Sequence, residues 1–428
     1  MCVMSNKVYD VIIIGAGASG LAAAIQCSRR KLSCLILDKN KKPGNKLYAA
    51  GNGRCNVTNR MYQSDVYYNN PFTDRIMAQT DIQEFTAQFF DEIGIRLINK
   101  NGYYYPMSMQ ASSVVWALLD AIDPHYVDRK QNTEVTDIEQ HFDADSHLTY
   151  KILCQDHSEY LCHSLILCIG GCSAPNLGAA DSTITYGLLD KLTIRYRPFK
   201  PALAPIYVKE DIKNLTGVRQ SAVLTVGRDN VTESGEVQFT ENGISGIVVF
   251  NLAEYIREAM DTSCPYVYIN PIPEITEEDY LARYQHLRSQ VPSKTILAFL
   301  NGFMNDKLAA YLVEQYGMYA QSEYTQTAAA INKKSRLEQI TPQQASNIYH
   351  YITHKFRLQA AAVSGFDKSQ ASSGGIITDQ ICPDTMEIRE RPGIYVAGEA
   401  IDVLGKCGGY NISFALYTGW VAGNHAGS

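Results

Sequence analysis

Long runs of lysine and arginine are missing from this chain of 428 residues, although it holds 38 of these residues. Aspartate and glutamate number 44, so the formal net charge is −6. Because proteins that bind nucleic-acid phosphates usually carry a basic patch, this balance disfavours nucleic acid as the main partner. Hydrophobic residues make up 46% and charged residues 19% of the chain. The composition predicts a folded protein of two or three domains.

Cysteines with metal-ligand spacing are also scarce. The chain has 11 cysteines, of which the nearest two are Cys168 and Cys172, and no second pair matches them. A zinc site needs such matching pairs, and an odd count in a chain this long argues against a disulfide framework. We therefore expect no metal site and reduced thiols, as in a cytoplasmic protein.

Uninterrupted apolar runs long enough to span a membrane are lacking. Residues 11–28 carry no charge but contain three glycines, and Asp10 stands where a signal peptide would have a basic residue. Residues 160–180 and 407–428 are broken by glycines and polar residues. The sequence therefore predicts a soluble, unexported protein with no membrane partner.

The first forty residues have the order of a dinucleotide-binding unit. Tyr9–Ile14 is apolar and β-branched at its end, which predicts a strand buried on both faces. It leads into Gly15-Ala16-Gly17-Ala18-Ser19-Gly20 and then into helix-forming residues from Leu21 to Arg30. A second apolar run, Ser33–Leu37, ends at Asp38. The strand before the glycines, the helix after them and the acid beyond make this pattern much more specific than the glycines alone.

Each glycine in this motif has an expected structural role. Gly15 permits a tight turn, Gly17 lets the backbone approach a pyrophosphate, and Gly20 lets the helix pack against the strand. The helix N-terminus offers free N–H groups and partial positive charge to the phosphates. Asp38 would accept hydrogen bonds from the adenosine ribose and would repel a 2′-phosphate, which disfavours NADP in this half of the site.

The C-terminal region indicates FAD rather than NAD. Ile394–Ala397 reads as a short strand followed by Gly398-Glu399, and Gly408-Gly409-Tyr410-Asn411 leads into a helix from about Ile412 to Ala422. In an FAD site, such an acid binds the ribityl chain or a phosphate-bound water. The helix N-terminus would point at the flavin C2 carbonyl and N1, which become anionic on reduction.

A third strand, at His163–Cys168, ends at Gly170-Gly171 and would return the chain to the FAD-binding domain. Together these segments predict the following FAD-binding residues: Gly15, Gly17, Ala18, Ser19, Gly20, Asp38, Lys39, Lys46, Gly51, Asn52, Gly53, Arg54, Cys55, Val135, Gly170, Gly171, Gly398, Glu399, Gly408, Gly409, Tyr410, Asn411 and Ile412. For Lys46, a solvated loop position is the alternative to a phosphate contact.

The segment Gly51-Asn52-Gly53-Arg54-Cys55-Asn56, followed by Thr58-Asn59, resembles the signature of the BaiN/YhiN-like flavoproteins, a family of NAD(P)/FAD-dependent oxidoreductases. The likeness continues through Gly243-Ile244-Ser245-Gly246, Ser373-Gly374-Gly375-Ile376 and Gly398-Glu399 to Asn411. The resemblance implies a bacterial FAD enzyme that reduces a steroid-like or bile-acid-like substrate. Two departures concern the substrate pocket: Gly178-Ala179-Ala180-Asp181 replaces the family's glycine-rich continuation, and Leu404 stands where an aspartate is common.

The fold class predicted is α/β, with a Rossmann-type FAD-binding domain of the glutathione-reductase kind that is interrupted by an insert. The first part of that domain would span residues 1–195 and the second part residues 351–428. Between them, period-2 patterns predict a small β-barrel-like part at residues 196–273, and helix signals predict a helical part at residues 274–350. Expected helices include Thr276–Val291, Ser293–Tyr316 and one that begins at Thr341-Pro342.

The sequence contains a single G-x-G-x-x-G motif. A transient donor such as NADH or NADPH would therefore visit the same pocket as the substrate, or bind without a Rossmann unit. The candidate catalytic residues are Arg54, Cys55 and Tyr410, with Tyr104 as a second choice of acid. The alternative for Arg54 and Cys55 is a loop that only shapes the cofactor cavity, and Cys55 has no C-x-x-C partner.

The function predicted is FAD-dependent reduction of a small unsaturated or carbonyl-conjugated substrate, with hydride transfer through flavin N5. Two alternatives remain open at this point. One is an FAD-binding protein that modifies tRNA, which the charge of −6 opposes. The other is a redox sensor that holds FAD without turnover.

Overall fold

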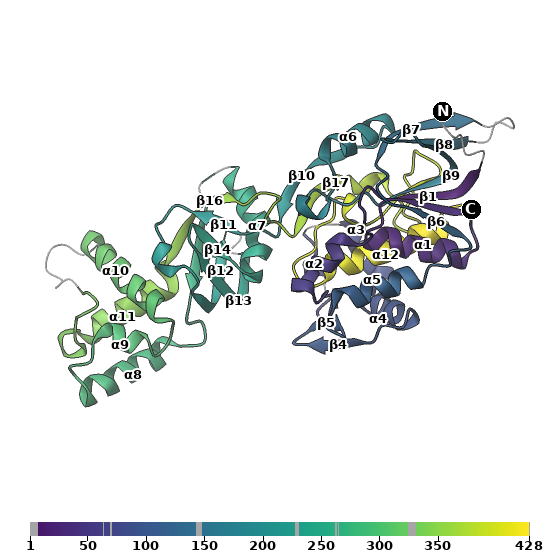
Figure 1. The fold of residues 1–428 in the computed structure, drawn as a ribbon. Helices are drawn as coiled ribbons and strands as arrows, with labels where there is room; N and C mark the ends of the chain where they lie inside the picture. The colour runs from purple at the N-terminus through teal and green to yellow at the C-terminus, as the bar shows by residue number, and fades with distance from the viewer. Residues whose placement is uncertain are drawn as a thin grey trace. The chain divides into compact units, whose positions relative to one another are not determined.

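The computed structural model describes residues 7–427 except residues 63, 69–70, 143–147, 227–230, 262, 264 and 324–330. The chain forms two compact units. One, here called the discontinuous unit, comprises residues 1–202 and 366–428, and the other, the inserted unit, comprises residues 203–365 (Figure 1). Each unit has its own hydrophobic core.

The discontinuous unit is built on a seven-stranded sheet. Five strands run parallel: β6 (Val127–Lys130), β2 (Cys34–Leu37), β1 (Val8–Ile14), β9 (Glu159–Leu167) and β18 (Ile394–Val396). Two antiparallel strands, β8 (Leu148–Cys154) and β7 (Val135–Phe142), extend it beyond β9. The short β18 comes from the C-terminal part of the chain and pairs with β9. The sheet therefore holds the two parts of the unit together.

Helices α1 (Ala18–Arg29) and α12 (Tyr410–His425) pack tightly together beside this sheet (Figure 1). Small residues allow the close approach. A Cβ atom on Gly419 would lie 2.1 Å from the Ser19 carbonyl oxygen, and one on Gly423 would lie 2.4 Å from the Ala23 carbonyl oxygen. Backbone contact between the first and last helices places the end of the chain against the glycine-rich turn.

The remaining elements of this unit surround the sheet. The helices are α2 (Asn45–Gly53), α3 (Pro71–Gln79), α4 (Ile82–Glu92), α5 (Ala111–Asp120) and α6 (Ser182–Lys191). A three-stranded sheet has the order β3 (Thr58–Asn59), β5 (Tyr103–Pro106), β4 (Leu97–Lys100), and β10 (Tyr196–Ala202) pairs with β17 (Ala371–Ile376). The predicted α/β Rossmann-type fold is confirmed.

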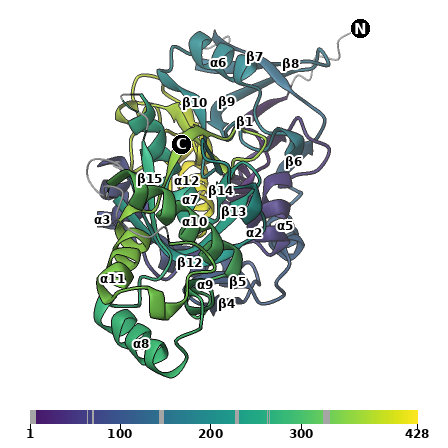
Figure 2. The ribbon, with the colours of Figure 1, turned by 90° about the vertical axis from the view of Figure 1, so that its left-hand side faces the viewer.

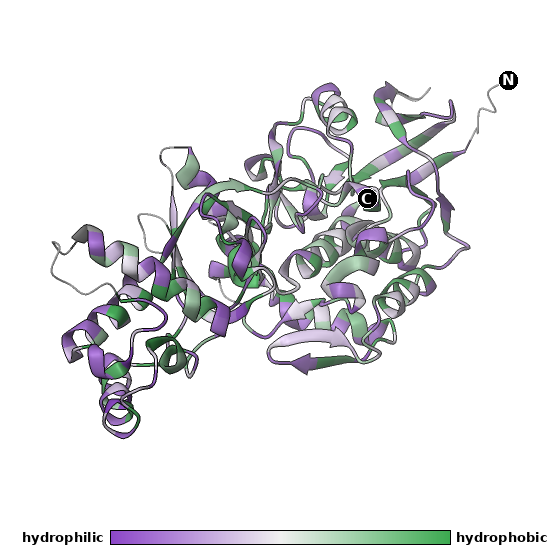
Figure 3. Cartoon of the chain, turned by 60° about the vertical axis from the view of Figure 1, so that its left-hand side comes forward, coloured by the Kyte–Doolittle hydropathy of each residue, from purple (hydrophilic) through white to green (hydrophobic). Residues whose placement is uncertain are grey.

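The inserted unit contains a closed six-stranded barrel. Its order is β11 (Ile206–Val208), β14 (Gly243–Ser245), β13 (Val231–Thr240), β12 (Arg219–Val226), β15 (Tyr266–Asn270) and β16 (Arg357–Val363). Helix α7 (Ile247–Met260) packs against it. Most strands and helices in Figure 3 carry both hydrophobic green and hydrophilic purple stretches, as expected of elements with one buried face.

Four helices lie between β15 and β16 in the chain: α8 (Glu277–Gln290), α9 (Ile296–Leu300), α10 (Asp306–Glu323) and α11 (Pro342–His350). Helices α8 and α11 lie side by side (Figures 1 and 2). Thr276 caps α8, and Thr341 with Gln344 forms the capping box of α11, as the sequence indicates.

Two expectations need correction. The single helix expected over Ser293–Tyr316 is two helices, α9 and α10, because the chain turns at Gly302 and Asn305 holds the start of α10 through its side chain. The insert expected at residues 196–350 occupies residues 203–365 instead. At its start, β10 pairs with β17 and so belongs to the discontinuous unit. At its end, the boundary falls between residues 365 and 366. The reason is β16, which closes the barrel by pairing with β11 and β15.

Among the described residues, no helix is long and apolar enough to cross a membrane.

Candidate functional site

The glycine-rich turn between β1 and α1 has three glycines in three different environments. A Cβ on Gly15 would lie 2.2 Å from the Cys168 carbonyl oxygen, and one on Gly20 would lie 1.9 Å from the Gly15 carbonyl oxygen. A Cβ on Gly17 would meet nothing within 4 Å. Gly15 and Gly20 are therefore required by the packing of the turn, whereas Gly17 faces open space at the first turn of α1. No side chain caps this helix end at Gly17.

Asp38 lies beside this turn at the end of β2. Its carboxylate accepts hydrogen bonds from the backbone N–H groups of Ala16 and Asn40, both at 2.6 Å. Burial raises the pKa of Asp38, and these hydrogen bonds act in the opposite direction. The carboxylate thus also shapes the glycine-rich turn, a role that its sequence position did not indicate.

The chain segment that follows β6 runs next to Asp38. The N–H group of Thr133 donates to the Asp38 carbonyl oxygen at 2.9 Å, and Lys39 pairs with Glu134 at 3.7 Å. Val135 is buried at the start of β7. The structure therefore brings Lys39 and Val135 to the part of the site where Asp38 lies.

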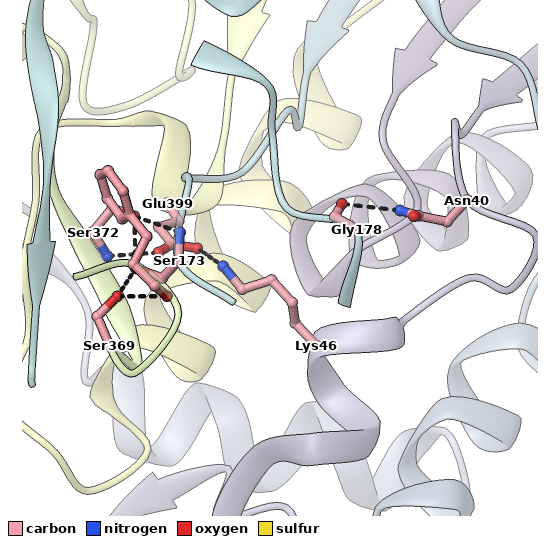
Figure 4. Close-up of polar contacts among 8 residues, drawn as sticks. Asn40, Lys46, Ser173, Gly178, Ser369, Ser372 and Glu399 are labelled. Carbon is pink, nitrogen blue, oxygen red and sulfur yellow. Dashed lines mark hydrogen bonds and ion pairs between the residues drawn. The ribbon is translucent and has the colours of Figure 1, made fainter. Parts of the chain in front are cut away.

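A network of polar contacts joins Glu399 to helix α2 and to β17 (Figure 4). Lys46 Nζ lies 2.5 Å from Glu399 Oε2, and the N–H group of Ser372 donates to Glu399 Oε1 at 2.8 Å. Both oxygens of the predicted cofactor-binding acid thus have partners in the chain itself. Lys46 is an ion-paired residue and not the freely solvated lysine of the alternative interpretation.

Sequence reasoning missed three serines of this network and one asparagine near it. Ser173, Ser369 and Ser372 are buried and bonded to one another, with Oγ–Oγ distances of 2.7 and 3.0 Å. Asn40 donates through its side chain to the Gly178 carbonyl oxygen at 3.2 Å (Figure 4). Isolated serines and a single asparagine carry no motif, so only the three-dimensional arrangement reveals them.

The turn before α12 lies against the segment at Thr58. Gly409 has φ +89°, and its Cβ position lies 2.5 Å from the Thr58 backbone nitrogen. A glycine is therefore needed at this position because two backbones meet there, and the contact of Gly409 with FAD stays a prediction. The Asn411 side chain holds Gly405 through two hydrogen bonds of 2.8 and 2.9 Å.

Tyr410 lies in a cluster of tyrosines at the start of α12. Its hydroxyl donates to the Met61 carbonyl oxygen at 2.6 Å, and its ring lies 5.2 Å from that of Tyr62. Burial raises the pKa of Tyr62 to about 12. Because the Tyr410 hydroxyl is buried and already hydrogen-bonded, the structure gives this residue a packing role and does not support it as the catalytic acid.

Arg54 and Cys55 are neighbours in one loop, but their side chains lie in different environments. Gly51 and Asn52 have left-handed backbones, with φ +57° and +55°, which kink the end of α2. The Arg54 side chain is exposed, and no described residue pairs with it. Cys55 is fully buried, and burial raises the pKa of its thiol to about 12. These features disfavour catalysis by Cys55 and leave Arg54 available to a ligand.

We expect the Cys55→Ala variant to keep turnover within a few-fold of the unchanged chain. A buried thiol with a raised pKa is protonated near neutral pH, and the thiolate is the reactive form. Alkylation with iodoacetamide at pH 8, followed by peptide mass mapping, should modify the partly exposed Cys382 well before Cys55. A rapidly alkylated Cys55, or an inactive but folded Cys55→Ala variant, would restore the catalytic interpretation.

The residues at this end of the sheet fit FAD. Gly17 provides a place for backbone approach, the first turn of α1 lacks a side-chain cap, and a carboxylate stands at the end of the next strand. Among the described residues, the buried Thr58 hydroxyl beside Gly409 has no hydrogen-bond partner. No group of three His, Cys, Asp or Glu side chains in the described part of the chain could hold a metal ion.

The whole chain also matches a known family. The HI0933-like protein Rossmann domain covers residues 9–425. The chain belongs to this family. It is 30% identical to the 3-dehydro-bile acid delta(4,6)-reductase of Clostridium scindens over 97% of this chain and 98% of that one. It is 26% identical to the ribosomal RNA dihydrouridine synthase of Escherichia coli over 96% of both chains.

The HI0933-like chain also resembles a solved structure. The 3-ketosteroid delta1-dehydrogenase of Sterolibacterium denitrificans matches 98% of this chain and 99% of its own with a TM-score of 0.50 and 11% identity. At that identity the likeness concerns the fold alone. The resemblance to the BaiN/YhiN-like flavoproteins is confirmed, and with it membership of an FAD-dependent oxidoreductase family. The contacts of individual residues with FAD remain predictions.

Proposed function

We propose that this HI0933-like protein uses FAD to reduce a carbon–carbon double bond conjugated to a carbonyl group, in a small steroid-like substrate. The observation that carries the proposal is the similarity over nearly the whole length to a 3-dehydro-bile acid delta(4,6)-reductase. By its name, that relative reduces double bonds near an oxo group. The dihydrouridine synthases are compatible with the same chemistry, since dihydrouridine is uridine with its carbonyl-conjugated double bond saturated.

The chain's own residues would bind and orient the cofactor. The first turn of α1, opened by Gly17, would receive the pyrophosphate, and Asp38 would receive the ribose hydroxyls with the lone pairs not used by Ala16 and Asn40. When bound, FAD would supply the two-electron hydride chemistry. The ion pair of Lys46 and Glu399 fixes the start of α2 against the segment that follows β18.

Arg54 is the residue best suited to meet a substrate anion or a phosphate. It is exposed, and the described part of the chain offers it no carboxylate partner. A guanidinium group is always charged and binds carboxylate or phosphate through two parallel hydrogen bonds. A bile-acid-like carboxylate would therefore find a partner in Arg54. Reduction of the double bond also needs an acid that donates a proton. We assign this role to neither Tyr410 nor Cys55.

We expect ping-pong kinetics with NADH or NADPH as the donor. The chain has one G-x-G-x-x-G motif, so donor and acceptor would take turns at one flavin face. Initial rates at several fixed substrate concentrations should give parallel double-reciprocal lines. Intersecting lines would show that both molecules bind at once and would contradict the shared pocket.

The function itself is tested with the FAD-loaded chain under anaerobic conditions. After photoreduction of the flavin, a 3-oxo-4,6-diene steroid should reoxidise it rapidly and stoichiometrically. The matched control is the saturated 3-oxo steroid, which lacks the conjugated double bond. A flavin that stays reduced with the dienone would reject the proposal for steroid-like substrates.

Ribosomal RNA modification is the second candidate. Two curated relatives, from Escherichia coli and Haemophilus influenzae, are named ribosomal RNA dihydrouridine synthases, each 26% identical over 96% of this chain. The net charge of −6 weighs against it, because RNA binding depends on neutralising phosphates. Ribosomal RNA free of dihydrouridine, added to the photoreduced chain, separates the candidates: reoxidation with formation of dihydrouridine would favour this second function.

A further inference from the structure

A polar cavity lies wholly within the inserted unit and shares no residue with the site described above. It has a volume of about 430 Å³, and small-molecule sites span roughly 300–1,000 Å³. Five tyrosines contribute to its walls, together with Arg357, Lys355, His354 and a single carboxylate, Glu210. Aromatic rings and basic side chains therefore make up most of the lining of this cavity.

One wall of the cavity is the outer surface of the barrel. Strand β15 alternates, so that Val267 is fully buried while Tyr266 and Tyr268 face outward. On the neighbouring strand β16, Leu358 is buried and Arg357 faces outward. The register pairs Tyr268 with Arg357, which sets the guanidinium group among the two tyrosine rings.

Arg357 is held in a defined orientation. Its guanidinium carbon lies 4.1 Å from the centroid of the Tyr266 ring, and Nη1 donates to the Tyr268 hydroxyl at 3.1 Å. No carboxylate of the described residues forms an ion pair with it. A flat cation that is fixed by aromatic neighbours keeps its remaining N–H groups directed to a ligand.

The facing wall comes from two helical segments. On α10, Tyr311, Gln315 and Tyr319 follow one another at four-residue spacing and therefore share one face of the helix. Helix α11 ends in a π-helical turn, Tyr351–Lys355, a rare conformation that occurs frequently at functional sites. That turn adds a tyrosine ring and Lys355 to the cavity.

We propose that this cavity binds a nucleotide. The rings would stack on a base, and the cations of Arg357 and Lys355 would pair with its phosphate. Glu210 accepts the N–H group of Gln359 at 3.0 and 2.9 Å with its two oxygens, and their other lone pairs can accept from ribose hydroxyls. Phenol hydroxyls and charged groups line the walls, which suits a nucleotide better than the apolar rings of a steroid.

The nucleotide can come from two sources, a free mononucleotide or one residue of a single-stranded RNA. The chemistry that the cavity recognises is the same in both, namely a planar base linked to a phosphate. The net charge of −6 disfavours a long RNA track but not a single anchored residue. The two sources are therefore compared directly in the experiment.

The experiment uses the full chain saturated with FAD, so that the Rossmann site is filled. Calorimetric titrations with 5′-AMP, 5′-UMP, adenosine and a hexauridylate probe the cavity. We expect at least one phosphate-containing probe to bind, and adenosine to bind about tenfold more weakly than 5′-AMP for want of the phosphate. A hexauridylate that binds at least tenfold more tightly than 5′-UMP would identify RNA as the source, and equal affinity would identify the free nucleotide.

Arg357→Ala should raise the dissociation constant about tenfold or more, and Tyr268→Ala should do the same through lost stacking. The matched control is Arg283→Ala, which removes an exposed arginine from α8 in the same unit and should change nothing. Thermal melts show which variants remain folded. The proposal is overturned if no probe binds at millimolar concentration, or if Arg283→Ala weakens binding as much as Arg357→Ala does.

Discussion

The Gly17→Val variant should fold normally and yet lose FAD almost completely. Gly17 has φ −79° and ψ −167°, which any residue adopts, and a Cβ there meets nothing within 4 Å. A cap change at this position costs about 1 kcal/mol or less in stability. The valine side chain would occupy the space through which the backbone approaches a pyrophosphate. We expect the dissociation constant for FAD to rise about 100-fold or more, as measured by flavin fluorescence during titration of the apoprotein.

Two further variants make the result specific. Gly187→Val places the same side chain at another open glycine, on α6, and should bind FAD normally. Gly20→Val should fail to fold, since its Cβ would lie 1.9 Å from the Gly15 carbonyl oxygen. If Gly17→Val binds FAD as the unchanged chain does, the first turn of α1 does not hold the pyrophosphate.

The fold could be predicted from the sequence where local signals agree with burial. The apolar run before Gly15 and the capping box at Thr341 each specify an element without help from distant residues. Strand β16 could not be assigned in this way. Its outward residues include Arg357 and Gln359, and it joins the barrel only through pairing with β11 and β15. Membership of a closed barrel depends on long-range pairing, which leaves no local signature.

The candidate site could likewise be predicted from the sequence only in part. Gly15 and Gly20 lie where the sequence placed them, because a side chain at either position would meet backbone atoms. The side-chain roles differ more: Glu399 is paired with Lys46, and the thiol of Cys55 is buried. Whether a side chain points to a ligand or to its own chain depends on packing between segments far apart in sequence. Motif spacing alone does not determine that direction.

Gly409→Val should destabilise the discontinuous unit strongly, whether or not FAD is bound. The residue has φ +89°, which a β-branched side chain rarely adopts, at a cost of about 1–3 kcal/mol. Its Cβ would also lie 2.5 Å from the Thr58 nitrogen and 2.8 Å from the Val57 carbonyl carbon. Overpacking of this kind adds about 1–3 kcal/mol. We therefore expect the free energy of unfolding in urea to fall by about 2–6 kcal/mol.

Gly94→Val separates the two causes of this loss. Gly94 has φ +81°, close to that of Gly409, but a Cβ there meets nothing within 4 Å. Its loss of stability should reflect backbone strain alone, and the additional loss in Gly409→Val would measure the contact between the turn before α12 and the strand at Thr58. That contact holds the C-terminal helix against the segment that follows the kinked end of α2. Equal losses in the two variants would mean that the two backbones do not meet at Gly409.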